Sequence, residues 1–269
     1  MGISSPRTSL SRFVVLRVAF GAVALAGLTS SSSAFGQGYG TIKGRLVYGG
    51  EGNPTPKVLV AKEDPAAKDS AVCAVNEITA KDLVVDPKTK GVSFGFAYLV
   101  APKGKNAEMV AKLIAKKPKV EIDQKGCEYS PHALAFHKDQ SLVFKSSDPV
   151  SHNVHYFAFT NGDSNQMVAP NGQLPKKFVA AERRPCKLVC DIHPWMQSYF
   201  MVFDHPFFAV TGADGSFEIT GVPAGTQTVV VWQESVGYVT PGLAKGVAVE
   251  VKAGETTDMG EVKLVPKTK

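Results

Sequence analysis

Short apolar runs, several of them alternating with polar residues, recur along most of the chain and constrain its fold more than any other feature. They are separated by turns rich in Gly, Pro, Asn and Asp. A period of two places one face of a strand in a core, and short runs spaced in this way are typical of β-sandwiches. The sequence therefore predicts an all-β protein. Clear examples are residues 141–146, 154–159, 199–203, 216–219, 228–232 and 247–251.

One segment departs from this pattern. Between Pro102 and Pro118, four apolar residues recur at helical spacing on one face: Met109, Val110, Leu113 and Ile114. Proline rarely lies inside a helix, so these two prolines bound the segment. We expect one short helix at about 106–117.

The N-terminus has the pattern of a secretory leader. Three arginines precede an apolar run of 11 residues, 18–28, and small residues follow it. The run is too short to span a bilayer, which takes about 20 residues. We expect cleavage after Gly36, a mature protein in the periplasm or secreted, and no membrane span. The formal charge of +6 falls to +3 without the three leader arginines, which is too weak to indicate nucleic-acid binding.

The stretch PCKLVCDIHPWM, residues 185–196, sets Cys190, His193 and Met196 at three-residue steps between two expected strands. Thiolate, imidazole and thioether, with a second imidazole, form the ligand set of a blue copper site. The second imidazole has to come from another strand. His152 and His155 are three residues apart, so on a strand they face opposite sides and only one can reach the site.

The motifs SHNVHY at 151–156 and CDIHPWM at 190–196 resemble, in this order, those of the cupredoxins, and of the amicyanin type in particular. The resemblance runs over about 118–205 and implies a Greek-key sandwich. It implies one type 1 copper per chain bound by His152, Cys190, His193 and Met196. It also implies that Asn153 tethers the two ligand segments and that His155 points away from the copper.

The same resemblance implies a function. The protein would carry single electrons between redox partners, one of them a protein such as a c-type cytochrome, and would be a monomer without enzymatic activity. In cupredoxins the downstream histidine brings the metal to the surface. His193, flanked by Pro194 and Trp195, is therefore the expected port for electrons.

A second resemblance covers both ends of the chain. Residues 208–239 and the closing strands look like a carboxypeptidase regulatory-like, or transthyretin-like, sandwich, with turns at GADG and VPAG. Residues 40–50 resemble its first strand. Either this smaller sandwich is split by the cupredoxin, or two domains follow one another. The expected map is a leader at 1–36, a β region with one helix at 37–117, the cupredoxin at 118–205 and the second sandwich at 206–269.

Several alternatives remain open at this stage. The loop could hold zinc or be purely structural, and Cys186 could join Cys190 in a binuclear purple copper centre if the chain folds back there. Copper could also be stored or handed on in an envelope structural protein. With Cys190 assigned to the metal, we favour a disulfide between Cys73 and Cys127 and leave the other pairings of these cysteines with Cys186 open.

Overall fold

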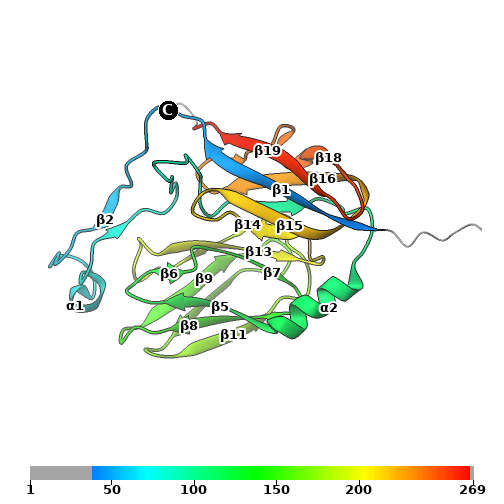
Figure 1. Cartoon of the computed structure of the whole chain (residues 1–269). Coiled ribbons are helices and arrows are strands. Elements are labelled where there is room, and N and C mark those ends of the chain that lie inside the picture. The colour runs from blue at the N-terminus through cyan, green and yellow to red at the C-terminus, as the bar shows by residue number, and fades with distance from the viewer. Residues whose placement is uncertain (1–37, 267–269) are drawn as a thin grey trace, which may run out of the picture. The chain divides into compact units, whose positions relative to one another are not determined.

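The computed structural model describes residues 38–266 (Figure 1). The expected leader lies outside the described residues. Strands dominate this part of the chain, so the all-β prediction is confirmed. No helix among the described residues is long and apolar enough to cross a membrane.

One sandwich is built from a continuous stretch of chain. Its five-stranded sheet has the order β10-β9-β12-β13-β7, and its four-stranded sheet has the order β11-β8-β5-β6. Phe136, Phe144 and Phe200 are fully buried between these sheets, and the ring of Phe200 contacts both of the others. The strands are β5 (Lys119–Gln124), β6 (Tyr129–Ser130), β7 (Ala133–His137), β8 (Ser141–Ser146), β9 (His152–Phe157), β10 (Ser164–Val168), β11 (Gln173–Lys177), β12 (Cys186–Val189) and β13 (Gln197–Phe203).

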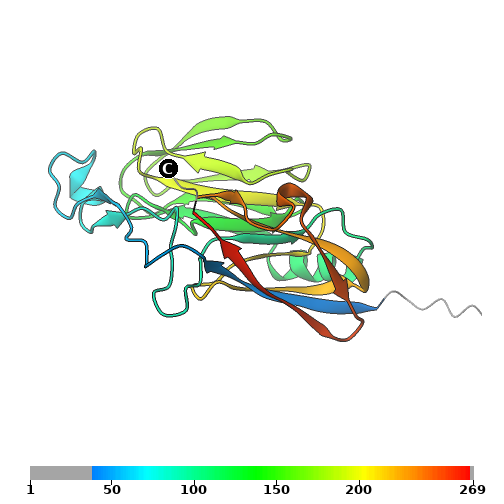
Figure 2. The same cartoon turned by 90° about the horizontal axis from the view of Figure 1, so that it is seen from above.

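A second sandwich takes its strands from both sides of the first along the chain. One sheet has the order β15-β1-β19, and the other has the order β14-β4-β16-β17, with β18 also paired to β16. In Figure 2, β1 (blue) runs beside β19 (red). The expected turn at GADG is present, and Gly215 in it has a φ of +78°, which favours glycine. The strands are β1 (Tyr39–Tyr48), β4 (Phe96–Leu99), β14 (Phe208–Val210), β15 (Ser216–Pro223), β16 (Gly225–Gln233), β17 (Gly237–Tyr238), β18 (Val247–Val251) and β19 (Thr256–Leu264).

The two sandwiches pack together through a third apolar cluster between the sheet of β4 and β16 and that of β7 and β13. Tyr98 and Phe203 meet there with ring centroids 5.2 Å apart. Beside this cluster, the buried side chains of His132 and Glu234 hydrogen-bond to each other, and Gln197 donates to Glu234 at 2.9 Å. The interface is therefore apolar at its centre with a buried polar pair beside it.

The expected helix is α2 (Ala107–Lys116), and it links β4 to β5. The side chain of Asn106 caps its first turn by accepting from the backbone N–H of Met109 at 3.0 Å. The four apolar residues predicted to share a face are its half-buried ones, and the rest of the helix is exposed. Two short helices were not expected: α1 (Ser70–Cys73) and the 3-10 helix η1 (Leu243–Lys245).

Residues 58–79, which we call the cap segment, lie between β1 and β4 along the chain. They comprise β2 (Val58–Val60), α1 and β3 (Ile78–Thr79). Val60, Cys73 and Ile78 are buried against the core of the first sandwich. A disulfide joins Cys73 of α1 to Cys127, as predicted, and so fastens the cap segment to that sandwich.

Candidate metal centre

The loop after β12 is closed by its own backbone. The N–H of Met196 donates to the carbonyl of His193 at 2.9 Å, and the N–H of Cys190 donates to the carbonyl of Met196 at 3.3 Å. Val189 and Gln197, which flank the loop, are paired across the antiparallel strands β12 and β13. The three residues singled out by the sequence therefore lie on one tight turn.

His152 is the first residue of β9, and β9 pairs with β12 on the edge opposite β13. This position brings His152 to the turn. The side chains of His152, Cys190 and His193 come together, with one ligand atom from each within 4.8 Å of the others. The Nδ1 atoms of the two histidines are 3.0 Å apart, and the Sγ of Cys190 is 3.7 Å from Nδ1 of His193. Met196 is 1% exposed and is placed by its backbone bond to Cys190 at the end of the same turn.

The ionisable groups of this cluster shift one another's pKa values. Burial by itself raises the pKa of the Cys190 thiol, but hydrogen-bond contacts with His152, His193 and the backbone of Asn153 outweigh it and bring the pKa down to about 6. Burial alone would lower the pKa of His152, yet its bonds to Asp148 and Cys190 raise it to about 9. In the metal-free protein a thiolate thus lies beside an imidazolium at neutral pH.

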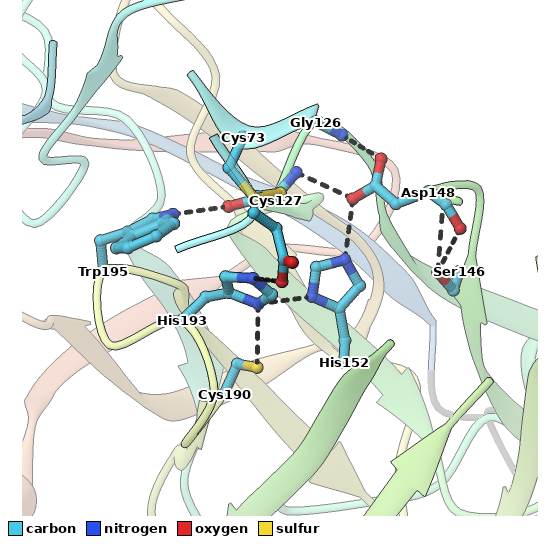
Figure 3. The surroundings of a disulfide bond; sticks show 10 residues. Cys73, Gly126, Cys127, Ser146, Asp148, His152, Cys190, His193 and Trp195 are labelled. Carbon is cyan, nitrogen blue, oxygen red and sulfur yellow. Dashed lines mark hydrogen bonds and ion pairs between the residues drawn. A yellow bond between two sulfur atoms is a disulfide. The ribbon is translucent and has the colours of Figure 1, made fainter. Parts of the chain in front are cut away.

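Each histidine uses its outer nitrogen for a carboxylate. The Nε2 of His152 is 2.9 Å from Oδ2 of Asp148, and the Nε2 of His193 is 3.0 Å from Oδ2 of Asp69. Both inner Nδ1 atoms are left facing the thiolate (Figure 3). Asp148 is also bound by the backbone N–H of Gly126, at 2.6 Å. Sequence reasoning missed both carboxylates.

The sequence contains a weak indication that Asp148 contacts His152, because the two residues are only four positions apart. Asp69 has none, since 124 residues separate it from His193 and only the fold brings the two together.

The expected exposure of His193 at the surface is wrong. Its side chain is 0% exposed, because Asp69 of the cap segment closes over its outer nitrogen. Trp195 packs beside it with ring centroids 5.3 Å apart and donates its indole N–H to the carbonyl of Cys127 at 3.1 Å. A cavity of about 350 Å³ opens next to the loop instead, lined by Trp195, Met196 and Tyr129 among others.

Asn153 joins the two ligand segments. Its side-chain carbonyl accepts from the backbone N–H of Asp191 at 2.6 Å, and its own backbone N–H points to Cys190 Sγ at 3.5 Å. His155 bonds to the Asp191 carboxylate at 2.9 Å and stays out of the cluster. Tyr129 adds a further link, since its hydroxyl contacts the carbonyls of Asn153 and Val189 at 2.7 and 3.0 Å.

Cys186 lies apart from this cluster. It is buried in β12 opposite Phe200, four residues before Cys190, which on a strand corresponds to about 13 Å. Burial raises the pKa of its thiol. Among the described residues, the groups of His, Cys, Asp and Glu close enough to share one ion do not include Cys186.

The donor set fits copper. Two imidazole nitrogens and one thiolate converge in a buried position with a thioether on the same turn, and the outer hydrogen bonds hold both imidazoles in the orientation that a metal requires.

No protein-family model and no curated protein matches the chain. Several solved structures do, and they are cupredoxins or contain one. The reduced Cu(I) form of an amicyanin variant is 19% identical over 32% of this chain and 82% of its own, with a TM-score of 0.29. A purple cupredoxin from Nitrosopumilus maritimus is 19% identical over 31% of this chain and 99% of its own, with a TM-score of 0.27.

The copper-containing nitrite reductase of Thermus scotoductus SA-01 is 14% identical over 32% of this chain, with a TM-score of 0.29. The match spans only 22% of the length of that reductase.

Proposed function

We propose that this is an exported mononuclear type 1 copper protein that carries single electrons in the periplasm or outside the cell. The observation that carries the proposal is the convergence of one ring nitrogen each from His152 and His193 with Cys190 Sγ, all within 4.8 Å of one another in a buried site. Copper held there would supply one-electron chemistry, because the thiolate and thioether suit Cu(I) and the imidazoles suit Cu(II).

The chain's own residues keep this site in one arrangement. Asp148 and Asp69 fix the outer nitrogens of the histidines, and Asn153 fixes the backbone beside Cys190. A rigid site favours electron transfer, since the ligands then need little movement between the two oxidation states. It disfavours storage or delivery of copper, for which the ligands have to open.

The partner would not approach His193 directly, because that side chain is buried. The cavity beside Trp195 and Met196 opens next to the ligand loop, so we place electron exchange with a protein such as a c-type cytochrome on that side. Nucleic acid plays no part in this proposal, and the chain acts as a monomer without enzymatic activity.

The visible spectrum of the copper-loaded protein tests the proposal. We expect a strong thiolate-to-copper absorption band and one copper per chain. Cys190→Ser should abolish the band, and Met196→Gln should keep it and lower the reduction potential, because a harder axial oxygen favours Cu(II). A colourless protein that holds zinc instead would contradict the proposal.

Reversible cycling separates the proposed function from copper storage. Oxidation and reduction of the loaded protein by a c-type cytochrome, at unchanged copper content, is the expected result. Loss of copper on each reduction would favour storage or delivery.

A further inference from the structure

Asp69 occupies a strained backbone position in the cap segment. It has a φ of 52° and a ψ of 43°, in the left-handed region that non-glycine residues seldom adopt. It immediately precedes α1, where an aspartate side chain usually accepts from the N–H groups of the first turn. Here the side chain makes no such bond. A residue that is both strained and released from its local role points to a different use of its carboxylate.

That use is visible in the side-chain contact that Asp69 makes with His193. Oδ2 of Asp69 lies 3.0 Å from Nε2 of His193, whose imidazole has no exposed surface. The backbone carbonyl of Asp69 accepts from the N–H groups of Val72 and Cys73, both at 2.9 Å. The sulfurs of the Cys73–Cys127 disulfide in turn lie within 4.8 Å of a ring nitrogen of His193 (Figure 3). The turn that carries Asp69 is therefore fastened beside the site.

We propose that Asp69 is the positioning residue of His193, and that its carboxylate lowers the reduction potential of copper held at the site. The part that concerns the potential rests on the proposed function. The part that concerns the orientation of His193 does not.

Two physical effects act in the same direction. By accepting the Nε2 proton, the carboxylate keeps His193 in the tautomer whose Nδ1 lone pair is free, and makes that nitrogen a stronger donor. Its negative charge also favours the more highly charged Cu(II) over Cu(I), because the histidine between the carboxylate and the metal is fully buried. Both effects make reduction harder.

Redox titration of the copper-loaded protein tests this. Asp69→Asn keeps the size and one possible acceptor but removes the charge, and Asp69→Ala removes both. We expect the equilibrium constant for one-electron reduction to rise at least tenfold in Asp69→Ala, which is about 59 mV, and by less in Asp69→Asn. One copper per chain and the visible band should be retained in both variants.

Glu63→Gln is the matched control, because Glu63 is an exposed acid of the same cap segment and its side chain pairs with Lys62 rather than with His193. It should leave the potential unchanged. An unchanged potential in Asp69→Ala, or an equal shift in Glu63→Gln, would overturn the assignment to this hydrogen bond.

A second measurement uses the metal-free protein, so it stands even if the chain binds no copper. In ring-nitrogen NMR of the wild type, Nε2 of His193 should carry a proton that exchanges slowly with water. In Asp69→Ala that proton should exchange fast. Equal exchange in the two proteins would refute the positioning role, whereas the absence of copper colour alone would refute only the proposed function.

Discussion

The backbone N–H of Cys127 donates to the carboxylate of Asp148 at 2.8 Å, so a residue of the disulfide also holds the carboxylate that binds His152. The other cysteine of the disulfide, Cys73, ends the short helix that follows Asp69. The only disulfide among the described residues therefore lies between Asp148 and Asp69, the two carboxylates that bind the histidines. The first prediction follows from this placement.

Removing the disulfide should loosen both the fold and the site. It closes a loop of 54 residues, and in the chain-entropy model its loss from Cys73→Ser/Cys127→Ser costs about 4 kcal/mol of the free energy of unfolding. Urea unfolding of the metal-free protein measures this loss. We also expect alkylating reagents to reach His193 and Cys190 faster in the variant. Unchanged reactivity would show that the cap segment stays closed without its crosslink.

Cys186→Ser distinguishes one copper from two. Because Cys186 lies about 13 Å along the strand from Cys190, we expect metal analysis to find one copper per chain in both wild type and variant, with the visible band retained. The buried hydroxyl should lower the free energy of unfolding by about 1–3 kcal/mol. A fall from two coppers to one would instead establish the purple centre.

His205 should make the fold sensitive to acid. Burial beside Phe207 lowers the pKa of His205 to about 4, and the nearby His137 adds to this, against the opposing effects of Asp204 and the backbone at Leu99. The unfolded chain therefore takes up the proton at a higher pH than the folded one. The stability from neutral His205 is fully present above pH ~6.5 and is lost as the pH falls towards ~4, by up to about 3 kcal/mol.

The measurement compares urea unfolding of wild type and His205→Asn across this range. The variant should lose less stability between the two pH values, since asparagine does not titrate. Parallel pH profiles for the two proteins would contradict the prediction.

Glu234→Ala should weaken the contact between the two sandwiches. It leaves buried His132 and half-buried Gln197 without their shared partner, and removing one member of a buried pair costs about 3–5 kcal/mol. Glu255→Ala is the control, because Glu255 forms an exposed pair with Lys252 and such pairs contribute little. Thermal unfolding should separate the two variants, and equal midpoints would show that the buried pair does not stabilise the fold.

The sequence predicted what depends on local pattern. Period-two runs gave the all-β class, and two prolines with four spaced apolar residues gave α2. The disulfide was favoured from the cysteine count and is confirmed. Close spacing also placed Cys190 and His193 on one turn.

What the sequence did not reveal depends on contacts between distant segments. The exposure expected for His193 was taken from a family in which this histidine brings the metal to the surface, whereas here Asp69 closes over it from 124 residues away. Backbone strain at Asp69 also has no sequence signature, because aspartate is ordinary at the start of a helix and only its dihedral angles reveal the different use.

The pairing of β1 with β19 has a consequence for the order in which the protein assembles. Thr41 lies opposite Thr256 in this parallel pair. The sheet that contains β1 therefore cannot be completed until nearly the whole chain has been synthesised. Contacts between such distant positions form slowly, because a long loop has to close first. The strands of the first sandwich are continuous in sequence, so they can pair with one another before the last part of the chain is synthesised. During synthesis, its ligand loop and histidines can therefore be in place while the other sandwich still lacks an edge, and late truncations should harm the second sandwich before the metal centre.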